Sequence, residues 1–474
     1  MPKQTLVMKF GGTSVGSADA LVKAAQIVKD ARAEYPRVVV ITSAMSGVTN
    51  LLLDSAELAS QGKVDSLAST ESTLREKHFA AADTLIKNEK LREVTKAEIN
   101  VLIFSLLDLC KAIAILGEAS PRAMDAVASI GERMCVRLLG AVLEDAGVNA
   151  KAIESTEFVV TNAHFQHAHP DFKATTEKTR QLLNPLIDAG IVPVTTGFIE
   201  ATPDGVITTL GRGGSDYSAA VIGSVLPADD VWIWTDVDGV MTTDPRIVKD
   251  AVTLPEITYS EIAELAYYGA KVLHPKTIRP VVDAGIGLRI CNTFNPTHPG
   301  TRLIANAPSD SKARNGQVVK AVTAIRNQRL VTIEGRGMLG VPGVAARAFG
   351  AVASTKTSVP LITQASSEQS ICFAVPSESA ASVLNALQAV FASEIEDEDI
   401  DRVWMTEDVS IITVVGVGMR HTPGVAGQVF TQLGNNKANV LAIAQGSSEV
   451  SISMVVAAAD TELAVKALHE LIVK

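Results

Sequence analysis

Short runs of β-branched and aromatic residues alternate with longer amphipathic segments from about residue 4 to about residue 305. The runs at 38–41, 191–194 and 231–234 are apolar throughout, and the segment 20–33 has the periodicity of an amphipathic helix. Strands without polar side chains are typical of a parallel sheet that is covered on both faces. The alternation therefore predicts an α/β fold in which a mainly parallel sheet lies between helices.

The length and charge of the chain narrow the class of ligand. Its 474 residues correspond to about three domains. Lys and Arg number 42 against 52 for Asp and Glu, so the net charge is −10. This acidic balance argues against nucleic acid or an anionic membrane surface as a partner, and small molecules are the expected ligands.

The chain shows no signal that directs it out of the cytoplasm. No apolar run approaches the roughly 18 residues of a membrane span, and the start, MPKQTLVMKF, lacks the features of a signal peptide. The four cysteines are scattered without C-x-x-C spacing, so neither a disulfide framework nor a structural zinc site is expected. The sequence thus predicts a cytoplasmic protein without a membrane span.

The C-terminal part contains an internal repeat. VTIEGRGMLGVPGVAARAF at 331–349 matches ITVVGVGMRHTPGVAGQVF at 412–430 without a gap, and ITQASSEQSI at 362–371 matches IAQGSSEVSI at 443–452. Each copy predicts a strand, a glycine-rich turn, a short helix and a strand pair, and two copies are too few for a solenoid. The polar stretch 306–317 is typical of a linker that leads to these paired modules.

Two glycine-rich loops, each between a predicted strand and a predicted helix, are candidate anion sites. The first contains Lys9, Gly11, Gly12 and Ser14, and the second, TTLGRGGSD, spans 208–216. Glycines let backbone N–H groups approach a phosphate, and a helix N-terminus favours an anion. Either loop alone could be a simple turn. Together they suggest one loop for the phosphates of a nucleotide and the other for the acceptor.

Glu132 lies on the apolar stripe of a helix predicted at 130–144, in line with Val136, Leu139 and Leu143. A carboxylate in that position is costly unless it is paired. Glu132 is therefore a candidate partner for a cationic ligand group such as an α-ammonium, and a buried structural ion pair is the alternative.

A third polar loop, WTDVDGVMTTDPR at 234–246, follows another predicted strand, where ligands of open parallel sheets bind. Its aspartates could bind Mg²⁺, but Asp-Gly and Asp-Pro are ordinary turn formers, and we favour the turn interpretation.

Two further patterns are excluded as ligand sites. Residues 335–340 fit G-x-G-x-x-G, but no acidic residue follows about twenty positions later, so a dinucleotide site is not expected. His164, His167 and His169 lie in a predicted mobile polar loop without a nearby set of cysteine or carboxylate ligands, so no metal site is expected.

Six motifs in series resemble those of the aspartokinase family. They are KFGGTS at 9–14, SAMSGVTN at 43–50, SIGER at 129–133, GRGGSD at 211–216, WTDVDGVMTTDPR at 234–246 and AKVLHP at 270–275. The C-terminal repeats resemble the tandem ACT domains (ferredoxin-like βαββαβ modules) of the same family. The resemblance implies an amino-acid kinase domain at 1–305, a linker at 306–319, and ACT modules at 320–400 and 401–474. As an alternative, the second module is inserted within the first and the C-terminal strand returns to the first.

The resemblance implies the reaction of ATP with L-aspartate to give 4-phospho-L-aspartate and ADP, which leads to lysine, threonine and methionine. It implies catalytic roles for Lys9 and Asp216, with Mg²⁺ carried by ATP. The residues implied to bind ATP are Lys9, Gly11, Gly12, Ser14, Thr235, Asp236, Met241, Arg246, Lys271 and Val272. Those implied to bind aspartate are Ser43, Thr49, Glu132, Arg212, Gly213, Gly214 and Ser215. Met241 departs from the tyrosine often found in the family, so ring stacking on the nucleotide is not expected there.

The ACT resemblance implies feedback regulation by an amino acid. ITQASSE and IAQGSSE are more similar to the threonine-sensitive type than to the lysine-sensitive type, although lysine stays open as the effector. The implied effector contacts are Ile362, Gln364, Ile443 and Gln445. A homodimer through the ACT modules is expected, with a tetramer open.

Two other functions are compatible with such a fold. Acetylglutamate, uridylate and carbamate kinases share it and use other acceptors. The other is a catalytically silent amino-acid sensor in which only the repeats work. Glu132, Arg212 and the repeats argue against the first alternative, and Lys9 with Asp216 argues against the second.

Overall fold

The computed structural model of the chain describes residues 4–270, 273–305, 318–364, 369–419, 422–446 and 450–473. It divides into two compact units. The N-terminal unit comprises Met1–Val240, Pro255–Ile257 and Leu273–Ala305. The C-terminal unit comprises Met241–Leu254, Thr258–Val272 and Asn306–Lys474.

A mainly parallel sheet forms the centre of the N-terminal unit. In the described part of the chain its strand order is β3-β4-β2-β1-β7-β9-β10-β8, and β10 runs antiparallel to β9. These strands are β1 (Thr5–Phe10), β2 (Arg37–Thr42), β3 (Ala150–Ile153), β4 (Val192–Thr196), β7 (Asp230–Thr235), β8 (Glu256–Thr258), β9 (Gly287–Asn292) and β10 (Thr301–Ile304). A separate hairpin pairs β5 (Ile199–Ala201) with β6 (Ile207–Thr209). The three apolar runs of the sequence lie in β2, β4 and β7, so these predicted strands are confirmed.

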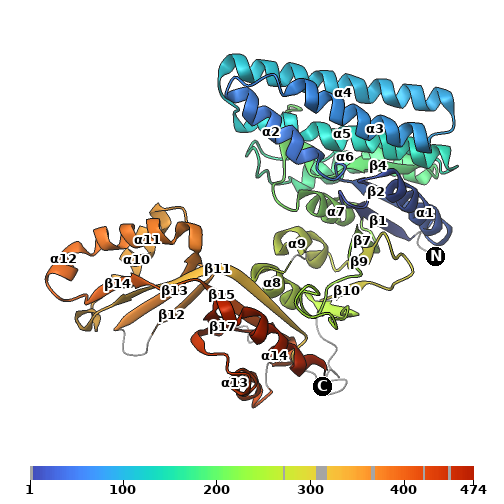
Figure 1. The fold of residues 1–474 in the computed structure, drawn as a ribbon. Helices are drawn as coiled ribbons and strands as arrows, with labels where there is room; N and C mark the ends of the chain where they lie inside the picture. Colours follow the sequence, from blue (N-terminus) through green and yellow to red (C-terminus); the bar gives the residue numbers. More distant parts are fainter. Residues whose placement is uncertain are drawn as a thin grey trace. The chain divides into compact units, whose positions relative to one another are not determined.

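Helices cover both faces of this sheet, as the sequence predicts (Figure 1). One face carries α1 (Ala18–Glu34) and α5 (Pro121–Asp145), and α2 (Val48–Ser60), α3 (Leu67–Leu85) and α4 (Glu89–Leu116) pack around α5. The other face carries α6 (Phe172–Asp188), α7 (Gly214–Val225) and α9 (Pro275–Asp283). Polar caps start several of these helices: the Ser17 side chain accepts from the N–H of Ala20, and that of Ser120 accepts from Ala123.

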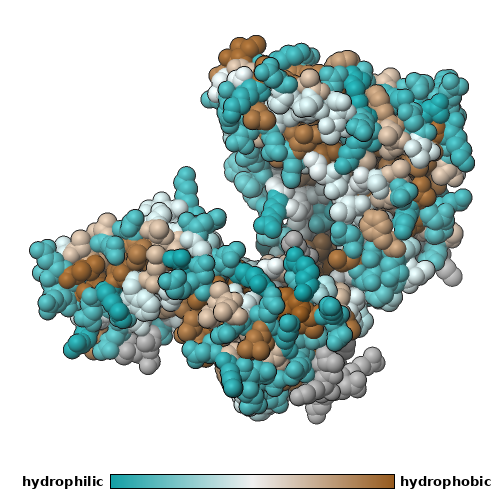
Figure 2. All heavy atoms as spheres, in the orientation of Figure 1, coloured by the Kyte–Doolittle hydropathy of each residue, from teal (hydrophilic) through white to brown (hydrophobic). Residues whose placement is uncertain are grey.

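Helix α4 corrects the expectation that no segment has the length and apolarity of a membrane span. Among the described helices it is the one that meets both criteria, and 39% of its most apolar window is buried. Its buried side chains, which include Ile99, Leu102 and Leu106, pack into the core shared with α3 and α5. Ile115 and Leu116 of the same helix are exposed. Figure 2 shows patches of apolar surface among the hydrophilic side chains of the helical layer.

The C-terminal unit consists of two modules on one sheet of seven described strands. The first module contains the second half of β11 (Ala321–Glu334), with α10 (Val344–Ser354), β12 (Leu361–Gln364), β13 (Ser370–Pro376), α11 (Ser377–Val390), α12 (Ala392–Glu396) and β14 (Arg402–Met405). The second contains the first half of β11, with β15 (Val409–Val415), α13 (Val425–Asn435), β16 (Val440–Ala444), β17 (Ser451–Ala457) and α14 (Thr461–Val473).

Strand β11 corrects the predicted module boundaries. Residues 321–325 pair with β15 of the second module, and residues 328–334 pair with β13 and β14 of the first. A bulge at 325–328, where Asn327 has a φ of 57°, separates the two halves. The first module is therefore inserted after the first strand of the second, which is the reverse of the insertion considered from the sequence.

The N-terminal unit ends at Ala305, but it does not include two segments that precede this residue. The segments Met241–Leu254 and Thr258–Val272 precede it in the chain but pack with the second module. The Thr242 carbonyl accepts from the Val322 N–H at 2.8 Å, and helix α8 (Tyr259–Tyr267) places Glu261 2.9 Å from Lys320 Nζ. Most of the predicted linker, 306–317, lies outside the described residues, whereas Val319 belongs to the core of the second module.

Candidate active site

The C-terminal end of β1 and the N-terminus of α7 bring two charged side chains together. Lys9 is the fifth residue of β1, and Asp216 lies in the first turn of α7. Their Nζ and Oδ1 atoms are 2.6 Å apart, and the Lys9 side chain is only 9% exposed. Gly213, the N-cap of α7, has a φ of 71°, a conformation that glycine adopts without strain. The two glycine-rich loops of the sequence therefore meet at one edge of the sheet.

A cavity of about 560 Å³ opens beside this ion pair, a size typical of small-molecule sites. Lys9 and Gly12 line it from the first loop, and Asp216 and other residues of the second loop line it from α7. All seven residues that the sequence analysis assigned to the acceptor also line it, namely Ser43, Thr49, Glu132, Arg212, Gly213, Gly214 and Ser215. The structure thus brings the predicted acceptor residues to one place.

Glu132 is buried on α5 with its carboxyl group in the wall of this cavity. Its Oε1 accepts from the Ala44 N–H at 3.2 Å, and its Oε2 has no hydrogen-bond partner among the described residues. Burial raises the pKa of this carboxyl to about 8, and Lys9 opposes the shift only weakly. Because no protein cation is paired with Glu132 in the described ranges, the site has a place for a ligand cation.

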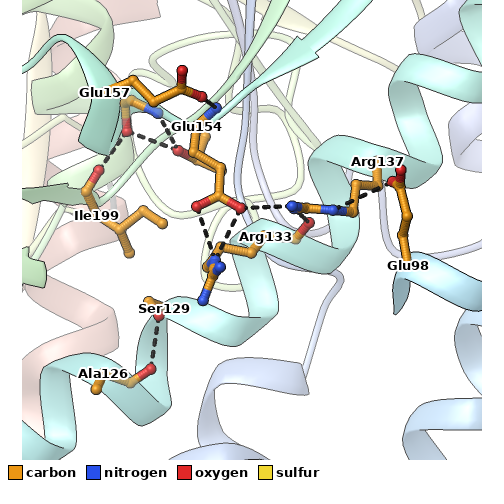
Figure 3. A network of polar contacts seen from close by, with 10 residues as sticks. Glu98, Ala126, Ser129, Arg133, Arg137, Glu154, Glu157 and Ile199 are labelled. Carbon is orange, nitrogen blue, oxygen red and sulfur yellow. Dashed lines mark hydrogen bonds and ion pairs between the residues drawn. The ribbon is translucent and has the colours of Figure 1, made fainter. Parts of the chain in front are cut away.

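The opposite side of α5 is held by a polar network, which Figure 3 shows. Arg133 Nε donates to both oxygens of Glu154 at 3.0 and 2.9 Å, and Arg137 lies 2.8 Å from the same carboxylate. Arg137 also lies 3.5 Å from Glu98 on α4. This network fixes the rotation of α5, so the face that carries Glu132 is directed at the cavity.

Two predicted phosphate ligands lie outside the cavity lining. The Ser14 side chain is fully buried and donates to the Trp234 carbonyl at 3.1 Å, while it accepts from Thr293 at 2.7 Å. The Gly11 N–H also donates to Trp234, at 3.0 Å. Both residues therefore fasten the first loop to β7, and they shape the phosphate side of the site without facing the cavity.

The predicted nucleotide residues are divided between the two units. Thr235 and Asp236 lie at the end of β7, where the Thr235 hydroxyl is 3.2 Å from the Asp236 carboxylate. Met241 and Arg246 belong to the C-terminal unit, in which Arg246 pairs with Asp244 at 2.6 Å. Lys271 and Val272 lie outside the described residues. None of the four described residues of this set, Thr235, Asp236, Met241 and Arg246, lines the cavity described above.

Sequence reasoning assigned no role to several other residues that line the cavity, among them Asp125, Gln166, Phe198 and Thr209. Gln166 and Phe198 adopt left-handed backbone conformations, with φ values of 68° and 69°. The pattern of side chains in the sequence does not predict these conformations. Asp125 had a detectable signal, because it precedes Glu132 by two helical turns and shares its face. Gln166 belongs to the histidine loop, which packs on the second glycine-rich loop through the Ala168 N–H and the Thr209 carbonyl, 2.9 Å apart.

A second cavity, of about 390 Å³, lies in the first module. The turn at 340–345 and the side chains of Gln364 and Ile371 line it. Of the four predicted effector contacts, Gln364 lies there, whereas Ile362, Ile443 and Gln445 are outside its lining. The G-x-G-x-x-G pattern at 335–340 leads into this turn. Among the described residues no group of three or more His, Cys, Asp or Glu side chains is arranged to hold a metal ion.

Comparison with known proteins identifies both parts of the chain. The model of the amino acid kinase family matches residues 4–292, and that of the ACT domain matches 331–391 and 412–471. The chain is 36% and 38% identical to bifunctional aspartokinase/homoserine dehydrogenases of Arabidopsis thaliana and Daucus carota over 98% of its length, and it spans about half the length of these relatives.

Other relatives match from end to end. The chain is 35% identical to lysine-sensitive aspartokinase 3 of Escherichia coli, with 98% of each chain covered. The crystal structure of E. coli aspartokinase III with aspartate and ADP superposes with a TM-score of 0.79 at 32% identity, over 99% of this chain and 100% of that one. The structure of the same enzyme with lysine and aspartate gives 0.79 at 33%. The chain therefore belongs to the amino acid kinase family and, within it, to the aspartokinases.

Proposed function

We propose that the chain is an aspartate kinase that transfers the γ-phosphoryl group of ATP to the β-carboxylate of L-aspartate. The observation that carries this proposal is the free buried carboxyl of Glu132 in the same cavity as the Lys9–Asp216 pair and the second glycine-rich loop. An α-amino acid needs one anion for its ammonium and one cation for its α-carboxylate. Glu132 supplies the anion, and the exposed guanidinium of Arg212 supplies the cation.

The chemistry needs positioning and charge stabilisation rather than a general base. A β-carboxylate oxygen of aspartate attacks the γ-phosphorus, and the bond from that phosphorus to the β,γ-bridging oxygen breaks to release ADP. The nucleophile is already ionised, so no proton has to be removed. Lys9 offsets the negative charge on the transferring group, and Asp216 holds the Lys9 ammonium in place.

The site is compatible with Mg²⁺ that enters it bound to the phosphates of ATP. Because the described residues show no set of three metal-ligating side chains, the phosphates would supply most of its ligands, with Asp216 the nearest cavity carboxylate to the phosphate side. The ion would neutralise phosphate charge when bound.

A panel of acceptors tests the proposal. ADP release would be measured with L-aspartate, N-acetyl-L-glutamate, carbamate and UMP for the wild-type chain and for Lys9→Ala and Glu132→Gln. We expect turnover with L-aspartate alone, a loss of roughly 10²- to 10³-fold in kcat for Lys9→Ala, and a rise of roughly 30-fold or more in the KM of aspartate for Glu132→Gln. Turnover with another acceptor, or full activity of Lys9→Ala, would reject it.

We further propose that the ACT modules bind an amino-acid effector, with threonine favoured by the sequence and lysine as the alternative. The cavity at Gln364 supports an effector site in the first module. The E. coli enzyme solved with lysine supports amino-acid binding by a relative of the same architecture. We also propose that the chain forms a homodimer in the cytoplasm. Its product would be used in the synthesis of lysine, threonine and methionine.

A further inference from the structure

Asp125 stands out among the cavity residues because it is a buried carboxylate that bonds to two loops and forms no ion pair within the described residues. Its side chain is 1% exposed. The Gln166 N–H donates to Oδ1 and Oδ2 at 3.1 and 2.9 Å, the Thr209 N–H donates to Oδ2 at 3.0 Å, and the Thr209 hydroxyl donates to Oδ1 at 2.8 Å. Both oxygens are thus satisfied by groups that belong to other segments.

The two loops that bond to Asp125 also contact each other. The Gln166 carbonyl and His167 Nδ1 both lie 2.8 Å from the position that a Cβ would take on Gly211, so the histidine loop lies directly against the start of the second glycine-rich loop. The Leu210 N–H donates to the Phe198 carbonyl at 3.1 Å. A displacement of Gln166 or Thr209 would therefore shift the backbone that leads into Arg212.

Asp125 and Glu132 share one face of α5, whose rotation the Arg133–Glu154–Arg137 network fixes from the other side (Figure 3). Glu132 belongs to this helix, and its Oε1 accepts from the Ala44 N–H at 3.2 Å. Arg212, in contrast, is exposed and makes no ion pair within the described residues, so its place depends on the backbone of its loop. Asp125 connects the rigid helix to that loop.

We propose that Asp125 is a positioning residue for the acceptor: it sets the distance between Glu132 and the loop that carries Arg212. The inference rests on the proposed function. The ammonium and the α-carboxylate of an amino acid are attached to the same carbon, so their two protein partners must stay at a fixed separation for both to bind. The ATP side of the site, at Lys9 and the first loop, has no hydrogen bond to Asp125. Loss of Asp125 therefore weakens aspartate binding and leaves ATP binding intact.

The test compares three variants with the wild-type chain. Asp125→Asn keeps the shape but turns an acceptor into an NH₂ group that faces N–H donors, and Thr209→Val removes one of the hydrogen bonds while it keeps the backbone N–H. The matched control is Asp171→Ala, which removes the N-cap of α6 at the far end of the histidine loop and lowers stability without touching the cavity. The readouts are the KM values of aspartate and ATP, kcat, the melting temperature, and aspartate affinity from calorimetry without ATP.

The KM of aspartate is expected to rise at least tenfold for Asp125→Asn and a few-fold for Thr209→Val, with the KM of ATP unchanged within twofold. Asp171→Ala is expected to lower the melting temperature and leave both KM values unchanged. An unchanged KM of aspartate in Asp125→Asn, or equal rises for aspartate and ATP, overturns the proposal. If Asp125→Asn does not fold, the KM values of aspartate and ATP for Thr209→Val test the proposal by the same criteria. Calorimetry separates the proposed kinase activity from the proposed role of Asp125. If the wild-type chain binds aspartate tightly but shows no turnover, the kinase activity is rejected, and the effect of Asp125→Asn on aspartate affinity still tests the positioning role.

Discussion

At the scale of single residues, the site depends on a carboxyl group that is costly to ionise. Glu132 is buried, accepts one backbone hydrogen bond and has a pKa near 8 because of its burial. At neutral pH it is therefore largely protonated without ligand. It must lose its proton to bind an ammonium group, so ligand binding and ionisation are coupled.

This coupling predicts how aspartate affinity depends on pH. Between pH 6.5 and 8 the affinity should rise by up to about tenfold per pH unit, and it should level off above pH 8. In Glu132→Gln the dependence should disappear along with most of the affinity. Calorimetry in two buffers with different ionisation enthalpies would measure the released proton directly. An affinity that is flat over this pH range in the wild type would show that Glu132 is already ionised.

Glu200 on β5 is a second carboxyl whose pKa burial raises to about 8, and it accepts from the Ser218 hydroxyl at 2.7 Å behind the start of α7. In the unfolded chain it ionises at a lower pH, so the folded state binds more protons between about pH 5 and 8. Stability must therefore fall as pH rises through that window. Below it the group is neutral in both states and the penalty is absent.

Glu200→Gln should therefore be more stable than the wild type by roughly 1–3 kcal/mol at pH 8, and about equal to it at pH 5. Urea unfolding at the two pH values measures the difference. Glu177→Gln on the exposed surface of α6 is the matched control and should show no such change. A Glu200→Gln advantage of the same size at both pH values would contradict this explanation.

At the scale of elements, α8 is held to the second module by two carboxylates: Glu264 accepts from the Ser451 hydroxyl at 2.7 Å, and Glu261 is fully buried. The Glu261 carboxylate accepts from Lys320 Nζ at 2.9 Å, from the Thr258 N–H at 2.9 Å and from the Val417 N–H at 2.7 Å. Val417 lies in the glycine-rich turn of the second module, whose counterpart in the first module leads into the cavity at Gln364. The Glu261 carboxylate thus links α8 to the glycine-rich turn of the second module.

Glu261→Ala should destabilise the C-terminal unit by roughly 3–5 kcal/mol, because it leaves the Lys320 ammonium and two backbone N–H donors without their acceptor. Lys320→Ala, which removes the partly exposed partner and leaves both N–H donors in place, should cost about 1 kcal/mol. Chemical unfolding followed by Trp404 fluorescence would report on this unit. Equal effects of the two substitutions would show that the ion pair, and not the backbone donors, holds α8.

Helices and strands could be predicted from the sequence where they depend on the pattern of neighbouring residues. The parallel strands and the helix with Glu132 on its apolar stripe follow from periodicity, and the structure brings the predicted acceptor residues of the motif series to one cavity. Gln166 and Phe198 were not found, because their left-handed backbone conformations have no sequence pattern. Asp125 shares the helix face of Glu132, but its hydrogen bonds to distant segments could not be predicted from the sequence. The long β11 was not found either, since its two halves have the same strand pattern and differ only in their partners.

At the scale of the whole molecule, the two modules are built as one body. They share β11, and one cluster of buried side chains includes residues of both. This cluster contains Leu330, Leu361 and Ala374 from the first module and Val409, Ile411 and Val455 from the second. The segments that contain Met241, Arg246 and α8 belong to the same unit. The proposed effector site and part of the predicted nucleotide-binding set therefore belong to one compact unit.

The most direct measurement of the central claim is the formation of aspartyl phosphate, trapped with hydroxylamine as the hydroxamate, with and without added threonine and with lysine in parallel. A threonine-sensitive aspartate kinase would form hydroxamate only when both ATP and L-aspartate are present, and threonine would suppress its formation. Suppression by lysine alone would keep the kinase and change the effector. An absence of aspartate-dependent hydroxamate from the folded wild-type chain would contradict the account.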